Sequence, residues 1–216
     1  MNARTARLLL SLLLLATSAA TQAQPAEYSG ILQVHNAQRL SVKVPPLRWS
    51  DAAAAQAQGW AEQLAREGCV ARYNPDPARR EKYGENILYV TAAKPYEGWR
   101  RKPFQVANRW GEEAFEYDHA THTCKNPGGT QCGQYLQMIW ETTEEMGCGR
   151  ARCPAAEVWV CNYTPRGLQD GLKPYGNPLA PPTSAAEPQL VIGALECSAL
   201  PQVNPGVDYP QQSPLP

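Results

Sequence analysis

The sequence predicts an α+β sandwich, in which helices and a few strands are joined by long loops that disulfides tie together. Three observations lead to this fold class. Apolar residues recur at helical spacing in three long segments. Two segments near the end of the folded part alternate in the manner of paired strands. Five of the seven cysteines lie between residues 124 and 161.

The N-terminal segment has the features of a secretory signal peptide. Two arginines precede an apolar run at residues 8–16, and small residues follow up to Ala23. This order is typical of a leader that is removed on export, and the run is too short for a membrane span. We expect cleavage near Ala20 or Ala23, so that residues 1–23 form the leader.

Charge and hydropathy restrict the partners. Removing the leader deletes two arginines and no acids, which takes the formal net charge from zero to −2. This balance does not predict a nucleic-acid-binding surface. No later stretch is apolar enough to cross a bilayer, so the sequence predicts no transmembrane span. The protein is expected to be secreted, or periplasmic if it is bacterial.

The three helical segments have recognisable ends. The first covers about residues 27–41. The second is capped by Ser50 or Asp51 and stops at Gly68. The third covers about residues 103–117 and begins at a proline, which is allowed in the first turn. A further short helix is expected at about residues 133–140.

The strands are shorter and lie mostly in the second half. Apolar and β-branched residues predict strands at residues 87–90, 146–152 and 158–163. Eleven of the twenty prolines follow residue 164. Their density favours a largely disordered tail at residues 177–216, which leaves one folded domain at residues 27–176.

Six short motifs, in a fixed order, carry a family resemblance. The motifs are His35-Asn36-Ala37-Gln38-Arg39, Pro46-Leu47-Arg48-Trp49, Tyr83-Gly84-Glu85-Asn86-Ile87, Trp110-Gly111-Glu112-Glu113, Tyr117-Asp118-His119-Ala120-Thr121-His122-Thr123-Cys124 and Cys132-Gly133-Gln134-Tyr135-Leu136-Gln137. With the ladder of cysteines they resemble the CAP superfamily of cysteine-rich secretory proteins, antigen 5 and pathogenesis-related protein 1, and most of all its plant subgroup. The resemblance implies an α-β-α sandwich with a small antiparallel sheet between helices.

The resemblance also implies a central cleft that holds two histidines and two glutamates. The glutamates are present as Glu85 and Glu113, but Tyr73 and Gln134 occupy the histidine positions, and Leu136 replaces the usual threonine. Zinc prefers imidazole or thiolate ligands, so we expect neither a bound metal nor another cofactor. The general base is missing as well, which argues against an enzyme.

The environment of Glu113 has two interpretations. Its helical spacing from Val106 and Trp110 places it on an apolar face, where a carboxylate needs hydrogen-bond donors. Alternatively it lies at the edge of that face and is solvated. The two carboxylates alone could hold a hard cation weakly, or the amide of Gln134 and the hydroxyl of Tyr73 could donate to both of them in a neutral network.

Other residues that could carry chemistry have simpler interpretations. His119, His122 and Cys124 have spacing that suggests a metal site, but a loop beside a disulfide is favoured in an exported protein. His35 is expected to be a hydrogen-bonded structural residue. Trp99, beside a basic cluster, is the candidate for an exposed aromatic side chain.

The cysteines are expected to form disulfides rather than a metal site. One pair flanks a turn-rich loop at residues 125–131, and a second pair lies on two consecutive strand segments. The resemblance implies the third pair. The expected disulfides are Cys69–Cys153, Cys124–Cys132 and Cys148–Cys161, with Cys197 unpaired.

Three functions remain open at this point. The first is a secreted, non-catalytic binding protein for a lipid, a sterol-like or other amphipathic ligand, or an extracellular partner. The second is an extracellular, protease-like hydrolase that uses Glu85 and Glu113. The third is a domain that binds the cell wall or another protein and has a vestigial cleft. Fold alone cannot choose among them, and the missing histidines count against the second.

Overall fold

The computed structural model describes residues 23–126 and 132–176. The predicted leader up to residue 22, the predicted tail and Cys197 lie outside these residues, as does most of the loop between Cys124 and Cys132. Within the described ranges, no helix is both long enough and apolar enough to cross a membrane.

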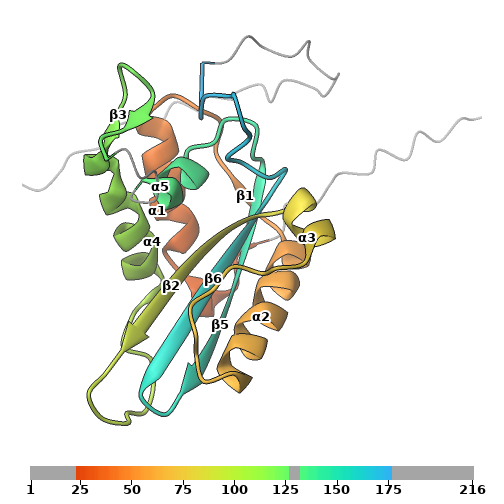
Figure 1. Ribbon diagram of the computed structural model, residues 1–216, viewed down its shortest axis with the longest axis vertical. Helices are drawn as coiled ribbons and strands as arrows, with labels where there is room; N and C mark the ends of the chain where they lie inside the picture. The colour runs from red at the N-terminus through yellow and green to blue at the C-terminus, as the bar shows by residue number, and fades with distance from the viewer. Residues whose placement is uncertain (1–22, 127–131, 177–216) are drawn as a thin grey trace, which may run out of the picture. The chain divides into compact units, whose positions relative to one another are not determined.

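The centre of the fold is a four-stranded sheet in the order β1-β5-β6-β2 (Figure 1). Its strands are β1 (Arg48–Trp49), β2 (Gly84–Thr91), β5 (Glu145–Cys153) and β6 (Ala156–Thr164). β6 pairs antiparallel with both β5 and β2, and β1 runs parallel to the first residues of β5. A separate antiparallel pair is formed by β3 (Tyr117–Asp118) and β4 (Thr123–Cys124).

Helices cover the sheet on both sides, which confirms the α-β-α sandwich (Figure 1). One face carries α2 (Asp51–Arg66), and α1 (Ile31–Ser41), α4 (Pro103–Gly111) and α5 (Gly133–Met138) lie on the other. The shorter elements are the helix α3 (Pro77–Lys82) and the 3-10 helices η1 (Ala26–Tyr28) and η2 (Glu112–Glu116).

Strand β6 shows why the sheet needs two covering layers. Its side chains alternate between the faces. Trp159, Cys161 and Tyr163 enter the core beneath α1 and α4, and Val158 and Val160 enter the core beneath α2. All five are buried. A strand that is apolar on both faces must be covered on both faces.

Two glycines of β5 allow α2 to lie directly on the sheet. A Cβ atom added to Gly149 would lie 2.2 Å from the Cα of Gln58, and one added to Gly147 would lie 2.2 Å from the backbone nitrogen of Ala54. Any side chain at either glycine would therefore push the helix away. The Ser50 hydroxyl, which accepts from the Ala53 N–H, begins the helix as predicted.

The motif at residues 35–39 stabilises the fold through hydrogen bonds to the backbone. The side chain of Asn36 both donates to and accepts from the backbone of Leu47. The fully buried Arg39 guanidinium donates to several backbone carbonyls, which fixes the chain around it. Those carbonyls belong to Pro45, Met138, Trp140 and Thr143.

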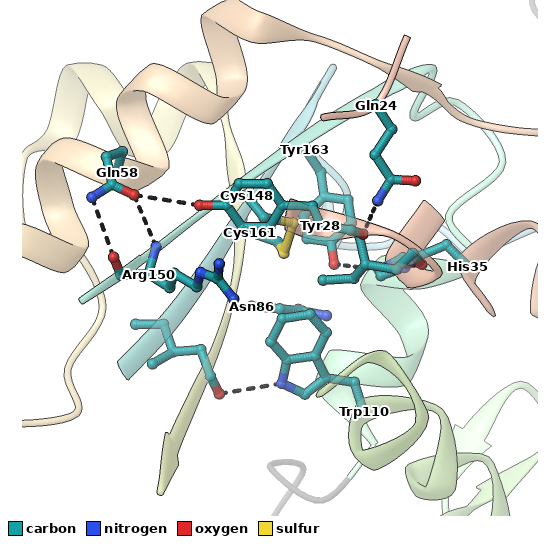
Figure 2. The surroundings of a disulfide bond; sticks show 12 residues. Gln24, Tyr28, His35, Gln58, Asn86, Trp110, Cys148, Arg150, Cys161 and Tyr163 are labelled. Carbon is teal, nitrogen blue, oxygen red and sulfur yellow. Dashed lines mark hydrogen bonds between the residues drawn. A yellow bond between two sulfur atoms is a disulfide. The ribbon is translucent and has the colours of Figure 1, made fainter. Parts of the chain in front are cut away.

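His35 is a buried structural residue, as predicted. Its Nδ1 lies 2.7 Å from the Ile31 carbonyl oxygen, and its Nε2 lies 2.7 Å from the Tyr163 hydroxyl (Figure 2). Burial lowers the pKa of His35 to about 4, against the opposing effect of the Ile31 carbonyl. The imidazole is therefore neutral at physiological pH and joins α1 to β6.

The observed elements differ from the predicted ones in two helix boundaries and in several short elements. The first helix is interrupted at Gly30, whose φ of 89° lies in the left-handed region, so η1 and α1 are separate. The third helix ends at Gly111, a weak helix former, and continues as η2. The helix α3 and the two-residue strands β1, β3 and β4 had no counterpart among the predicted elements.

Among the residues that the structure describes, there are three disulfides, and they join the same cysteines as those expected from the sequence. One joins the end of α2 to the end of β5, and one links β5 to β6 across the sheet. The third links β4 to the residue before α5. The pairs are Cys69–Cys153, Cys148–Cys161 and Cys124–Cys132 respectively.

Candidate functional site

The candidate site is a cleft of about 470 Å³ where the beginnings of β2 and α5 meet α3. A later segment, residues 166–170, completes one wall. The lining combines charged, amide and apolar groups, among them Tyr73, Arg79, Arg80, Tyr83, Glu85, Asn86, Gln137, Arg166, Leu168 and Asp170. Of the four residues expected in the cleft, Tyr73 and Glu85 line it directly.

Both oxygens of the Glu85 carboxylate are occupied. One accepts from the Asn74 backbone N–H at 2.8 Å, and the other lies 2.8 Å from Nη1 of Arg79. Burial raises the pKa of the Glu85 carboxyl, and the Asn74 N–H and the Arg79 guanidinium act in the opposite direction. The carboxylate is thus a bound component of the wall rather than a free base.

Arg79 is the functional residue that the sequence analysis missed. It lies on α3, where its guanidinium also donates to the Gln56 carbonyl oxygen at 3.0 Å. The sequence does contain a signal for this helix. Asp76 caps it by accepting from the Ala78 N–H, and Pro77 occupies the first turn.

Glu113 is not among the residues that line the cleft; it lies in η2 and is half-buried. One of its oxygens accepts from the backbone N–H groups of Gln134 and Tyr135 at 2.8 and 3.3 Å, in the first turn of α5. Burial raises the pKa of the Glu113 carboxyl, while these two N–H groups oppose the rise. Of the two interpretations, the structure matches the one in which donors surround the carboxylate.

The donors are not the ones expected. The side-chain oxygen of Gln134 accepts from the Ile87 N–H at 3.1 Å, so the Gln134 side chain hydrogen-bonds to the backbone of β2 and not to the glutamates. Tyr73 is exposed and donates no hydrogen bond to either glutamate. The two carboxylates therefore accept hydrogen bonds from backbone N–H groups and from Arg79. The Gln134 side-chain amide and the Tyr73 hydroxyl, which were expected as donors, do not take part.

Tyr73 nevertheless interacts electrostatically with both glutamates. Although 57% of the Tyr73 surface is exposed, its partial burial raises the pKa of Tyr73, and the charges of Glu113 and then Glu85 raise it further. The three groups therefore share one electrostatic environment. A neutral phenol in that environment can donate a hydrogen bond to a bound molecule.

The leucine that lines the cleft is Leu168 and not Leu136, which replaces the family's usual threonine. Leu136 packs against the core beneath α1 and α4 and does not line the cavity. Leu168, with 41% of its surface exposed, lines it instead. α5 turns the Leu136 side chain inward, a direction that spacing within the motif did not reveal.

Comparisons with known proteins identify the family to which the chain belongs. A model of the CAP family, described as the cysteine-rich secretory protein family, matches residues 32–163. The chain belongs to the CAP family. Pathogenesis-related protein 1A of Nicotiana tabacum is 35% identical over 170 residues, which are 76% of this chain and 89% of that protein. Pathogenesis-related protein 1 of Arabidopsis thaliana is 33% identical over 155 residues, covering 71% and 84% respectively.

Solved structures share the CAP fold. Venom allergen-like protein 4 of Schistosoma mansoni has a TM-score of 0.50 at 26% identity, covering 66% of this chain and 90% of that one. The crystal structure of NaASP2 with Zn²⁺ has a TM-score of 0.56 at 22% identity, covering 70% of this chain and 86% of that one. The zinc belongs to that crystal, and at this identity the likeness concerns the fold alone.

The remaining histidines of this CAP domain hydrogen-bond to tyrosines. Nδ1 of His119 lies 2.7 Å from the Tyr175 hydroxyl, and Nδ1 of His122 lies 2.9 Å from the Tyr117 hydroxyl. Both histidines lie on or beside the β3–β4 hairpin, next to the Cys124 disulfide. Among the residues the structure describes, no group of three or more His, Cys, Asp or Glu side chains could hold a metal ion.

Proposed function

We propose that this CAP protein is a non-catalytic binding protein that takes an amphipathic ligand into the Glu85 cleft. The observation that carries the proposal is the occupation of both Glu85 oxygens by Asn74 and Arg79. Because both oxygens are engaged by protein donors, neither is free to take a proton from a bound substrate, and the cleft lining includes no histidine. The preformed cavity can still supply affinity without any reaction.

The lining supports an amphipathic ligand. Leu168 and the rings of Tyr73 and Tyr83 offer apolar surface, whose burial contributes roughly 25 cal/mol per Å². Arg80 and Arg166 lie in the same cleft and offer donors to a polar head group. A lipid or a sterol-like molecule with one polar end combines these requirements.

Export is part of the proposal. The sequence features of residues 1–23 and the three disulfides both suit an oxidising compartment outside the cytoplasm. A stapled domain with a preformed cavity is suited to carry or sequester a ligand there. A cell-wall component or an extracellular protein would be an alternative partner for the same surface.

An extracellular hydrolase is the second candidate, and Glu113 is the observation that favours it. Only one of its oxygens accepts hydrogen bonds in the described part of the chain, and burial raises its pKa. A half-buried carboxyl with a raised pKa can serve as a general acid. In this alternative Glu113 would be the reacting group, and Glu85 would hold Arg79 in place.

A matched pair of leucine variants tests the binding function. Leu168 and Leu172 are similarly exposed, at 41% and 49%, but only Leu168 lines the cleft. We expect a fluorescent sterol or fatty acid to bind the purified protein, Leu168→Asp to weaken binding at least fivefold, and Leu172→Asp to leave it unchanged. Mass spectrometry of the purified protein should also find a co-purified lipid.

Two outcomes would replace the proposal. Turnover of peptides, esters or glycans that Glu113→Gln abolishes would establish the hydrolase. If the protein neither binds lipid nor turns over any substrate, the third function would be favoured, in which the domain binds the cell wall or another protein and the cleft holds no ligand. Lipid binding that neither leucine variant weakens would show that the probe binds outside the cleft.

A further inference from the structure

A second cavity, separate from the cleft, lies at the edge of the sheet. It measures about 460 Å³, and its lining residues are different from those of the cleft. β1 pairs with only the first two residues of β5, so the edge of β5 beyond them is not covered by a strand. We call this cavity the Arg150 groove; Glu27, Tyr28, Trp49, Gln58, Trp99 and Arg150 are its main lining residues.

Gln58 of α2 holds Arg150 in place from the side. Its side-chain oxygen accepts from the Arg150 N–H at 3.0 Å, and its side-chain nitrogen donates to the Arg150 carbonyl oxygen at 3.2 Å (Figure 2). This amide thus satisfies the same two groups that a neighbouring strand would satisfy. The backbone from which the Arg150 side chain projects is therefore rigid.

Aromatic rings surround the Arg150 side chain. The guanidinium carbon lies 4.2 Å from the ring centre of Trp99, 4.9 Å from that of Trp159 and 5.3 Å from that of Tyr28. Trp99 is exposed, as expected, and packs edge-on against Trp159. Stacking of this kind leaves the edge of a guanidinium, where its N–H groups point, available to a partner.

The guanidinium N–H groups at that edge have few acceptors. Within the described part of the chain, the Arg150 guanidinium makes no hydrogen bond, and its one ion pair joins Nη2 to Glu27 Oε2 at 3.6 Å. The Arg150 side chain is 13% exposed, whereas Glu27 is 62% exposed. A largely buried cation that is paired so weakly would gain from a carboxylate that enters the groove.

We propose that the Arg150 groove binds a small carboxylate with a flat apolar body. The carboxylate displaces Glu27 and accepts from the Arg150 guanidinium, and the body lies against the rings of Tyr28, Trp49 and Trp99. A single negative charge fits best, because Arg150 is the only cation among the described residues that line the groove, and Glu27 stands beside it. A dianion such as a phosphate would meet one cation and one acid.

Calorimetry with two isosteric probes tests this site at low salt and neutral pH. We expect 2-naphthoate to bind one-to-one and the neutral 2-naphthamide to bind at least about tenfold more weakly, since a charge-assisted pair is lost. Arg150→Gln should weaken naphthoate binding at least about tenfold. Glu27→Gln should strengthen it about threefold or more, because the competing carboxylate is gone. Arg166→Gln, in the cleft, should leave it unchanged.

The variant Glu27→Gln keeps the test decisive even if Arg150→Gln fails to fold, since Glu27 is at the surface. The proposal is overturned if naphthamide binds as well as naphthoate, or if Glu27→Gln does not raise affinity. It is also overturned if Arg166→Gln, rather than Arg150→Gln, removes binding. Absence of naphthoate binding to the Glu27→Gln variant at millimolar concentration would end it as well.

Discussion

Arg79 and Glu85 form a nearly buried ion pair at the wall of the cleft. Nη1 of Arg79 lies 2.8 Å from Oε2 of Glu85, and the two side chains are 9% and 10% exposed. Removing one partner of such a pair leaves an uncompensated charge, which costs far more than the pair contributes. Replacing either residue alone should therefore destabilise the folded protein.

The first prediction concerns this pair. Arg79→Gln should lower the free energy of unfolding by about 3 kcal/mol at neutral pH, measured by denaturant unfolding. The double variant Arg79→Gln with Glu85→Gln should recover most of the loss, because no charge is left unpaired. The control is Arg48→Gln, whose pair with Glu144 is exposed and should matter by less than about 1 kcal/mol. Equal losses in both single variants would contradict the prediction.

The second prediction uses His35. Its pKa falls from 6.5 to about 4 in the folded protein, so between these values the unfolded chain binds more protons than the folded one. Stability should therefore rise by about 3 kcal/mol as the pH increases from 4 to 6.5. His35→Gln should flatten this rise, and His119→Gln, on the exposed hairpin, should not. Denaturant unfolding at a series of pH values gives the measurement.

The third prediction has the opposite sign. The folded protein raises the pKa of Glu113 above its ordinary value of 4.5, so above that value the folded state holds a proton that the unfolded state loses. The contribution of Glu113 to stability should fall as the pH rises from 4.5 through the folded pKa. Glu113→Gln should remove this fall, and Glu112→Gln, its exposed neighbour, should leave it. An unchanged pH profile in Glu113→Gln would refute the assignment.

The fourth prediction concerns zinc. Calorimetric titration at neutral pH should show no site of micromolar or tighter affinity, because Arg79 holds Glu85 and no imidazole lines the cleft. Replacing Tyr73 and Gln134 by histidine, together with Arg79→Gln, should create measurable affinity that Glu85→Gln then abolishes. A tight site in the native protein that disappears on Glu85→Gln would disprove the prediction.

The fifth prediction compares two glycines at the contact between α2 and β5. Gly149→Ala should lower the free energy of unfolding by about 1–3 kcal/mol, since its Cβ would collide with the α2 backbone. Gly59→Ala, on α2 with no atom within 4 Å of the new Cβ, should raise it by about 0.5–1 kcal/mol. Thermal unfolding of the two variants should shift the midpoint in opposite directions.

The fold was predictable because its signals are local. The alternation of β6 and the cap at Ser50 can be read from neighbouring residues, and both positions behave as expected. The breaks at Gly30 and Gly111 were not predicted. They depend on a left-handed backbone at one glycine and on a change of hydrogen-bonding pattern after the other, and apolar spacing reports neither.

The site was harder to predict because its contacts join distant segments. Glu85 and Glu113 were found by their motifs, but their donors could not be inferred from spacing. Arg79 reaches Glu85 from a helix of only six residues, and Gln134 turns its amide to the backbone of β2. The rings around Arg150 likewise come from three separate segments, which no sequence pattern brings together.

The disulfide between Cys69 and Cys153 also determines how the molecule responds to proteases. It spans 84 residues, and the connection between β2 and α4, residues 92–102, lies inside that span. Lys94, Arg100 and Arg101 make this connection a natural target for trypsin-like cleavage. A chain nicked there stays covalently joined, because each fragment keeps one of the two cysteines. The nicked molecule should migrate as a single species until a reductant separates the halves.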